Sequence, residues 1–162
     1  MTDAILVRSA IAADFDQWLP LWEAYNSFYE RSGPTALPSG ITAATWDRLL
    51  DPEEPMHAIV ATDGKRLMGI GHYLFHRSTI MLRMTCYLQD LFTDPAARGR
   101  GIGRLLIREV YERAEAAGSS RVYWHTRETN AVARALYDTV AQRSPLVVYR
   151  HNLYSTLLRQ AA

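Results

Sequence analysis

Cysteine is nearly absent from this chain, and its scarcity limits both the compartment and the chemistry. Cys86 is the only cysteine among 162 residues, which excludes an intramolecular disulfide framework and a cysteine-based zinc cluster. A single thiol is typical of proteins that work in a reducing compartment. Excess charge of one sign is also lacking, because the formal net charge is only +1. A dedicated nucleic-acid-binding protein is usually strongly basic, so we expect no nucleic-acid partner.

Long hydrophobic runs are missing as well. The sequence has no stretch of 18 apolar residues, and no apolar run follows a basic segment near its start. We therefore expect no membrane partner and a cytoplasmic protein. The 48% hydrophobic and 22% charged residues are ordinary globular values, and the length suits one domain with a full core over 1–162.

The chain does contain a segment rich in glycine and arginine, between a strand pattern and a helix pattern. Residues 87–93 are apolar and β-rich, and the turn signal Asp94-Pro95 closes them. Residues 98–103 read Arg-Gly-Arg-Gly-Ile-Gly, and 104–117 have apolar residues at helical spacing. Glycines let the backbone approach a ligand closely, and the N–H groups at a helix N-terminus point at it. This order therefore predicts an anion site.

Three known glycine loops have this position, and their spacing separates them. A P-loop ends in Gly-Lys-Ser/Thr, which the sequence lacks. A dinucleotide fingerprint needs a small residue where Arg104 or Leu106 stands, which argues against an NAD(P)-dependent oxidoreductase. The third pattern, Arg/Gln-x-x-Gly-x-Gly/Ala, is met by Arg98, Gly101 and Gly103. It resembles the pyrophosphate loop of the GNAT superfamily of acetyl-CoA-dependent N-acetyltransferases; a tight turn without a ligand is the alternative interpretation.

Hydrophobic periodicity predicts the remaining elements. Apolar residues at steps of three and four predict a helix over 14–29, and Pro20 inside it predicts either a kink or two abutting helices. A loop over 31–40 precedes a second short helix, and a last helix is expected over 130–141. Strands are predicted over 4–9, 56–62, 67–76, 80–93 (with a distortion near its end), 121–126 and 145–152.

The order of these elements, β-α-α-β-β-β-α-β-α-β, predicts the fold class. The strands after the second helix meet first as hairpins, and later strands connect through helical crossovers. That connectivity implies an α/β (α+β) fold with a single mixed, mostly antiparallel sheet flanked by helices.

The same order is that of the GNAT fold, and the local match is closer. Residues 87–92 followed by 98–103 resemble the corresponding stretch of diamine (spermidine/spermine-type) acetyltransferases. Asn130 and Tyr137 fall where that group has its cofactor-contacting asparagine and its catalytic tyrosine. The resemblance covers about residues 67–151. It implies an acetyl-CoA-dependent N-acetyltransferase with a cofactor-binding core over about 84–141 and without a metal.

The resemblance also implies how acetyl-CoA is held. Backbone N–H groups of 98–103 would cradle the pyrophosphate, and the arginines would add charge-assisted contacts; a solvated helix face is the alternative for each arginine. Residues 91–93 would pair with the pantetheine arm as an extra strand would, and a bulge there would turn an N–H toward the thioester carbonyl. The expected cofactor-binding residues are Leu91, Phe92, Thr93, Arg98, Gly99, Arg100, Gly101, Ile102, Gly103, Arg104 and Asn130.

The implied mechanism is direct attack of a neutral amine on the bound thioester. Asn130 and Tyr137 are seven residues apart and share a helix face. Tyr137 would protonate the departing thiolate, although a buried tyrosine is often only core packing. Asn130 would bond the pantetheine or backbone amides, or simply cap its helix. A covalent route through Cys86 is disfavoured, because that thiol lies in an apolar strand without a nearby histidine.

One position departs from the pattern, because diamine acetyltransferases have a glutamate where this chain has Gln89. An alkylammonium with a pKa of about 10 must lose a proton before it attacks, and an amide cannot take it. Asp90 is adjacent, but strand alternation points it to the opposite face unless the bulge re-aims it. A water chain to another group, a base in the N-terminal half and an already neutral amine remain open. Tyr137, Asp90 and Gln89 are the candidate catalytic positions; His72, His76 and His125 are further bases, each more often structural.

The amine acceptor is expected to lie against the N-terminal helices. Glu23, Tyr25, Asn26 and Tyr29 offer a carboxylate, two hydroxyls and an amide, which suit a cationic amine; a polar helix face is the alternative. The acceptor would be a small or polyamine-like amine, or a protein amine. Because dimerisation is common in the family, the resemblance also allows a homodimer. The alternative function is a catalytically idle acyl-CoA-binding or sensor domain, which the missing glutamate favours and the presence of Tyr137 and Asn130 disfavours.

Overall fold

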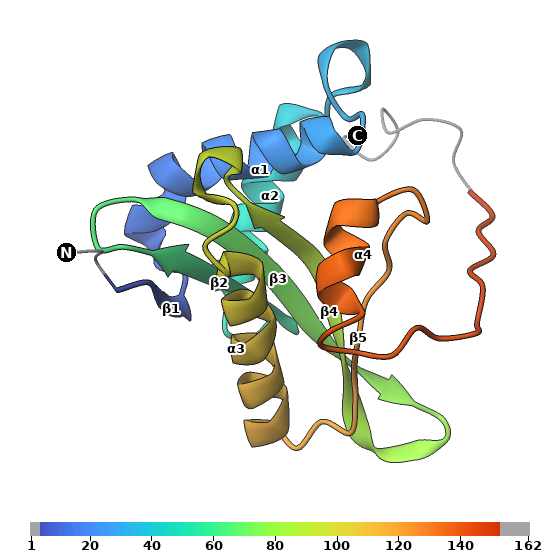
Figure 1. Ribbon diagram of the computed structural model, residues 1–162. Coiled ribbons are helices and arrows are strands. Elements are labelled where there is room, and N and C mark those ends of the chain that lie inside the picture. Colours follow the sequence, from blue (N-terminus) through green and yellow to red (C-terminus); the bar gives the residue numbers. More distant parts are fainter. Residues whose placement is uncertain (1–3, 153–162) are drawn as a thin grey trace.

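A mixed sheet is the centre of the structure, a computed structural model that describes residues 4–152. Within that range five strands follow one another across the sheet in chain order, and all neighbours are antiparallel except β4 and β5, which are parallel (Figure 1). The predicted α/β class with one mixed, mostly antiparallel sheet is confirmed. The strands are β1 (Leu6–Ser9), β2 (Met56–Thr62), β3 (Leu67–Ser78), β4 (Met81–Thr93) and β5 (Val122–Tyr123).

Helices cover both faces of this sheet (Figure 1). α1 (Phe15–Phe28) and α2 (Ser39–Leu50) pack on one face. α3 (Ile102–Ala116) and α4 (Ala131–Tyr137) pack on the other. In the part of the chain that the structure describes, none of the helices has the length and apolar character needed to cross a membrane. Short 3₁₀ turns occur at Ala12–Asp14, Gly33–Thr35 and Pro95–Ala97.

Three tryptophans fix α1 and α2 to the sheet. The Trp18 side chain is completely buried, and its ring lies 5.5 Å from that of Trp22 and 4.6 Å from that of Trp46. Trp22 Nε1 also donates to Thr42 Oγ1 on α2, at 3.2 Å. Large aromatic rings contribute much buried apolar area, and indole N–H groups usually find a partner when buried. The stack therefore sets where α1 lies over β3 and β4.

A β-bulge at Gln89 changes which side chains of β4 face each helix layer. His72 on β3 pairs with Asp90, and Tyr73 pairs with Leu88, so Gln89 is an extra residue. Asp90 contacts α1, whereas Leu88 belongs to the core under α3. Uninterrupted alternation would have placed Leu88 and Asp90 on the same face. This bulge is the distortion expected near the end of the 80–93 strand.

One predicted strand is much shorter than expected, and another is wrong. The 121–126 strand is not buried and forms only β5, because it pairs with β4 only at Cys86 and Tyr87. Residues 145–152 form no strand in the described structure. β-propensity reports fit to a pleated, half-buried surface, and no neighbouring strand supplies one here. The apolar side chains of that segment are 67–93% exposed: Leu146, Val147, Val148 and Tyr149.

The helices differ from prediction mainly at their ends. α1 passes through Pro20 as one helix, so the alternative of two abutting helices is wrong. Pro20 lies only one and a half turns into α1, where a proline removes a single backbone hydrogen bond. α4 ends at Tyr137 rather than at residue 141, and α3 begins at Ile102 rather than at residue 104.

A buried hydroxyl in β4 gives a test of this core. Thr85 is fully buried, and its Oγ1 has no hydrogen-bond partner among the described residues. We expect Thr85→Val to raise the free energy of unfolding by about 1 kcal/mol, because an unsatisfied buried hydroxyl is replaced by a methyl group of similar size. Urea denaturation measures the change.

The matched control is Thr62→Val in β2. Thr62 is also buried, but its Oγ1 donates to the Arg66 carbonyl at 2.8 Å and accepts from the Gly64 N–H at 3.0 Å. Removing this hydroxyl leaves two groups without their partner, so stability should fall by roughly 1–3 kcal/mol. Equal effects of the two substitutions would show that Thr85 Oγ1 has a partner in solution.

Candidate active site

The loop between β4 and α3 has a conformation that glycine adopts more easily than any other residue. Gly99 and Gly101 both have φ of +77°, where other L-residues are strained. Gly101 directly precedes α3, so the loop ends at the helix N-terminus. The first N–H groups of an α-helix have no partner within the helix and lie at the positive end of its dipole. This end of α3 is suited to an anion such as a phosphate.

β4 has a free edge beside this loop. β4 and β5 pair only at Cys86–Val122 and Tyr87–Tyr123. Further along β4, residues 91–93 line a cavity whose far side is formed by α4. Backbone groups on an unpaired sheet edge can bind an extended ligand as an additional strand. Because β4 and β5 no longer pair beyond Tyr87, there is room for such a ligand beside residues 91–93.

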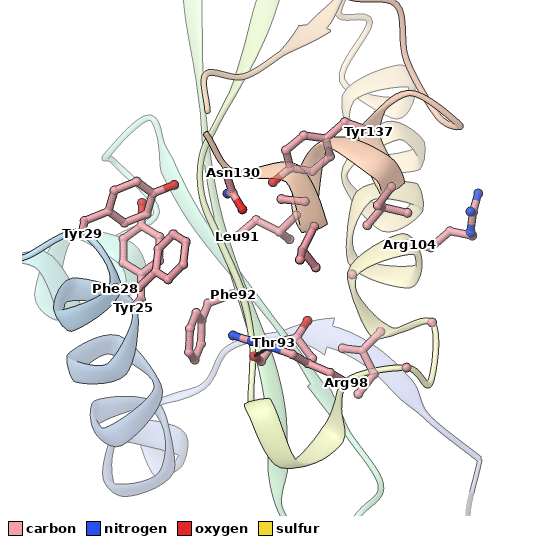
Figure 2. A pocket seen from close by; sticks show the side chains of 17 residues that line it. Tyr25, Phe28, Tyr29, Leu91, Phe92, Thr93, Arg98, Arg104, Asn130 and Tyr137 are labelled. Carbon is pink, nitrogen blue, oxygen red and sulfur yellow. Dashed lines mark hydrogen bonds between the residues drawn. The ribbon is translucent and has the colours of Figure 1, made fainter. Parts of the chain in front are cut away.

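The cavity has a volume of about 350 Å³ and lies between α1, the end of β4, the glycine loop and α4. Figure 2 shows aromatic side chains of α1 on one side, β4 in the middle, and Asn130 and Tyr137 on the opposite side. The cavity therefore places an anion site, an open strand edge and a phenol around one space. Its lining residues are Tyr25, Phe28, Tyr29, Leu91, Phe92, Thr93, Arg98, Gly99, Gly101, Ile102, Gly103, Arg104, Asn130, Val132, Ala133, Leu136 and Tyr137.

A narrower cavity adjoins the first one on the side of the bulge. It shares Tyr25, Tyr29, Leu91 and Tyr137 with the larger cavity. Its other lining residues are Leu88, Gln89, Trp124 and His125. Gln89 therefore faces this space. The shared residues mark the junction between the two cavities.

Tyr137 lies at this junction, at the last residue of α4. Trp124 packs edge-on against its ring, with centroids 5.3 Å apart. Burial raises the pKa of the Tyr137 phenol to about 12. Tyr137 therefore remains a proton donor over the whole physiological pH range.

Asn130 lies at the start of α4 without capping it. Its side chain makes no cap hydrogen bond to the helix, and its Nδ2 donates to Thr126 Oγ1 at 3.1 Å. The side-chain carbonyl is thus left for a ligand in the cavity. The N-cap alternative for Asn130 is not what the structure shows.

The three arginines of the loop lie in different places. Arg98 lines the cavity, and its guanidinium carbon lies 5.9 Å from the Phe92 ring centroid. Arg104 lies at the rim, where its Nη2 donates to Thr139 Oγ1 at 2.9 Å, and Figure 2 shows it pointing away from the other labelled side chains. Arg100 is outside the lining, and its Nη1 contacts Met68 Sδ at 3.2 Å. Arg98 is therefore the best placed of the three to reach a phosphate.

Asp90 lies under the cavity floor and does not line it. Its carboxylate accepts a hydrogen bond from Tyr25 Oη at 2.5 Å and lies 3.0 Å from His72 Nδ1. Trp18 Nε1 is 3.0 Å from the other ring nitrogen of His72. The bulge thus does not bring the Asp90 carboxylate into the cavity, because Tyr25 lies between them.

The four predicted acceptor residues divide into two pairs. Tyr25 and Tyr29 line both cavities. Glu23 is exposed outside the lining, and Asn26 is buried, where its Nδ2 donates to the Trp22 carbonyl at 2.8 Å. Asn26 is therefore a structural residue of α1 rather than part of the cavity wall.

Several lining residues were missed from the sequence. Phe28 is three residues after Tyr25, so the helical spacing of α1 gave a signal that it shares the face of Tyr25 and Tyr29. The α4 residues had a similar signal, because they lie between Asn130 and Tyr137. The missed residues of α4 are Val132, Ala133 and Leu136.

Comparison with known proteins identifies the family. A family model described as Acetyltransferase (GNAT) family matches residues 18–140. This chain belongs to the GNAT acetyltransferase family. The resemblance seen in the sequence is confirmed at the level of the superfamily, and the protein is an acyltransferase of the N-acetyltransferase class.

Two curated relatives illustrate the GNAT enzymes that this chain resembles. It is 33% identical over 156 residues to D-amino-acid N-acetyltransferase HPA3 of Saccharomyces cerevisiae, an alignment that covers 95% of this chain and 94% of the relative. It is 36% identical over 80 residues to thialysine N-epsilon-acetyltransferase of Sus scrofa, covering 49% of this chain and 46% of the relative.

Solved structures support the same fold. A transcriptional regulator from Bacillus halodurans C-125 matches with a TM-score of 0.78 and 20% identity, over 93% of this chain and all of that chain. AAC(6')-Iy in complex with the bisubstrate analogue CoA-S-monomethyl-acetylneamine matches with a TM-score of 0.77 and 14% identity, over 92% of this chain and 98% of that chain. At these identities the similarity concerns the fold.

Cys86 is unsuited to carry an acetyl group in this GNAT enzyme. Its side chain is fully buried under α3, and burial raises the pKa of its thiol to about 11. We expect the native thiol to react with Ellman's reagent at pH 8 on the order of 100-fold more slowly than after unfolding in urea, because the thiolate is the reactive form. Incubation with acetyl-CoA alone should leave the protein mass unchanged. An acetylated Cys86 in the mass spectrum would contradict this assignment.

Proposed function

We propose that this GNAT enzyme transfers the acetyl group of acetyl-CoA to the primary amine of a small molecule, by direct attack within a ternary complex. The observation that carries the proposal is the shared space around Tyr137. There the larger cavity, with the glycine loop and the free edge of β4, meets the narrower cavity, which is lined by Gln89, by Tyr25 of α1 and by Tyr29 just after that helix. Two substrates held in these spaces would meet beside one proton donor.

The larger cavity suits the coenzyme. The N-terminus of α3, the loop backbone and Arg98 would hold the pyrophosphate by charge-assisted hydrogen bonds. Leu91, Phe92 and Thr93 would pair with the amides of the pantetheine arm. Asn130 offers its side-chain carbonyl on the opposite wall. In this arrangement the thioester end would extend toward the junction of the two cavities.

Tyr137 is the residue that we assign as the general acid. When the amine attacks, the carbon–sulfur bond breaks and negative charge develops on the coenzyme sulfur. A phenol that is protonated at the working pH can neutralise that charge. The raised pKa of Tyr137, about 12, suits this role at neutral and alkaline pH.

The narrower cavity has a volume of about 20 Å³, so it would receive the amino group of a small acceptor, whose remaining atoms would extend out of it. Tyr25, Tyr29 and Tyr137 surround it with hydroxyl groups and ring faces, which attract an ammonium group. The relatives named D-amino-acid N-acetyltransferase and thialysine N-epsilon-acetyltransferase support an amino acid or a related amine as acceptor. The sequence-based possibility of a polyamine belongs to the same test, whereas a protein amine lies outside the small molecules proposed.

Acetylation of an amine panel tests this function. Coenzyme A release is followed as free thiol with D-amino acids, thialysine and spermidine as acceptors. We expect turnover with at least one of them, and Tyr137→Phe to lower kcat by about 10²–10⁴-fold, because the general acid is lost. The dissociation constant for coenzyme A, measured by calorimetry, should stay within about twofold of that of the unmodified protein.

Tyr111→Phe is the matched control for this substitution. Tyr111 lies on α3 outside both cavities, and its hydroxyl donates to the Val140 carbonyl at 2.9 Å. It should therefore keep full activity although it loses a comparable hydroxyl. Coenzyme A binding without turnover of any amine would instead favour an acyl-CoA-binding or sensor domain.

A pair of glycine substitutions tests where the coenzyme binds. Gly101 and Gly64 both have positive φ, +77° and +86°, and a Cβ at either position meets no atom within 4 Å. Alanine should destabilise both sites by roughly 1–2 kcal/mol of backbone strain. Only Gly101→Ala should weaken coenzyme A binding, by about tenfold or more, because it reshapes the loop before α3. An equal loss of affinity in Gly64→Ala would exclude this loop as the specific site.

A further inference from the structure

We infer that Tyr25 and Asp90 together accept the proton that the acceptor amine must lose before it attacks. The inference rests on the proposed function and assigns the acceptor-activating group of that same site. Gln89 faces the narrower cavity, but its amide cannot take a proton. Directly behind the wall of that cavity, however, a hydrogen-bonded series of side chains leads into the core.

The donors fix the direction of each hydrogen bond in this series. The Trp18 indole can only donate, so His72 Nε2, 3.0 Å away, is the acceptor and the imidazole proton lies on Nδ1. His72 Nδ1 then donates to Asp90 Oδ2 at 3.0 Å. The Tyr25 hydroxyl donates to Asp90 Oδ1 at 2.5 Å. Asp90 is therefore a carboxylate that accepts two hydrogen bonds, one from the core and one from the cavity wall.

Tyr25 is the only member of this series that reaches the cavities. It lines both of them, whereas Trp18, His72 and Asp90 line neither. Because the Tyr25 hydroxyl gives its hydrogen to Asp90, its oxygen lone pairs remain available to an N–H of the bound ammonium. An amine in the cavity would thus be connected to Asp90 by hydrogen bonds through a single atom, the Tyr25 Oη.

The surroundings of Asp90 favour a relay over a stable phenolate. Burial and the neighbouring Asp90 charge raise the pKa of Tyr25 far above its usual value. Tyr25 therefore does not remain deprotonated: it donates its own proton to Asp90 while it accepts one from the amine. The Asp90 carboxylate is the final proton acceptor. The titratable groups around this pair are Tyr29 and Arg31 from α1 and the turn after it, His72 from β3 and Tyr87 from β4.

The protons balance along this route. One ammonium proton moves to Tyr25 Oη while the Tyr25 proton moves to Asp90 Oδ1, which leaves a neutral amine and a neutral carboxylic acid. The nitrogen lone pair forms the C–N bond at the acetyl carbon, and the C–S bond breaks. Tyr137 protonates the departing sulfur and recovers a proton from the nitrogen, which becomes the amide. Asp90 returns its proton to solvent through Tyr25, so one proton is released per turnover.

Two acceptors that differ in basicity test the relay. The fastest primary amine of the panel is compared with its aminooxy analogue, which is already neutral at pH 7 and needs no base. We expect Tyr25→Phe and Asp90→Asn to lower kcat/KM for the amine by about 10²-fold or more, as for loss of a general base. For the aminooxy analogue the loss should stay within about threefold, because only proton removal is impaired.

Raising the pH gives an independent readout. Each pH unit below the pKa of the amine changes its neutral fraction about tenfold. The activity of Tyr25→Phe toward the amine should therefore rise about tenfold per unit and approach that of the unmodified enzyme at high pH. A purely structural role of Tyr25 would give no such recovery.

Tyr73→Phe is the matched control, because Tyr73 on β3 is buried as Tyr25 is but lines neither cavity. Its kcat/KM should change by the same factor for the amine and for the aminooxy analogue.

Equal losses of kcat/KM for both acceptors in Tyr25→Phe, or no loss at all, would overturn the relay. A selective loss in His125→Asn instead would assign the base to His125, which also lines the narrower cavity. Tyr25→Phe is sufficient if Asp90→Asn does not fold. Failure of the unmodified enzyme with every amine would refute the proposed function itself.

Discussion

Backbone pairing along β4 is the constraint on which the rest of the structure depends. Just before the bulge at Gln89, β4 pairs on both sides at Cys86 and Tyr87; after the bulge, only β3 remains as a partner. The bulge also turns Asp90 toward α1 while Leu88 stays under α3. One extra residue therefore separates the segment that holds the sheet together from the segment that lines the cavity. The geometry of the cavity therefore depends on the register in which β4 pairs with β3.

The parts of the site that follow from local chemistry could be predicted from the sequence. Glycines at positive φ before a helix, with an arginine three residues upstream of the second one, define the loop whatever surrounds it. The seven-residue spacing of Asn130 and Tyr137 places both on one face of α4, and both line the cavity. Hairpin strands with a clear turn, such as β2 and β3, were found with nearly correct ends for the same reason.

The parts that depend on contacts between distant segments could not be predicted. Trp18 meets His72 across 54 positions of the chain, and Tyr25 meets Asp90 across 65. The hydrophobic periodicity of one segment does not indicate which residue of a distant segment it will contact. The segment from Leu146 to Tyr149 was mispredicted in the opposite sense: it has strong β-propensity, but it pairs with none of the described strands and forms no strand. β-propensity indicates that a segment can form a strand, whereas its contacts with neighbouring segments determine whether the strand forms.

The free edge of β4 has a consequence for access to the backbone of this strand. An unpaired strand edge is a template on which another polypeptide can add a strand, and such edges lead to aggregation when they are exposed. Here the open edge at Leu91 to Thr93 is recessed between α1 and α4. A thin, flexible chain can enter that space, whereas a strand attached to a sheet of its own is too broad. The recess therefore limits access to this edge to ligands that are narrow enough to enter between α1 and α4.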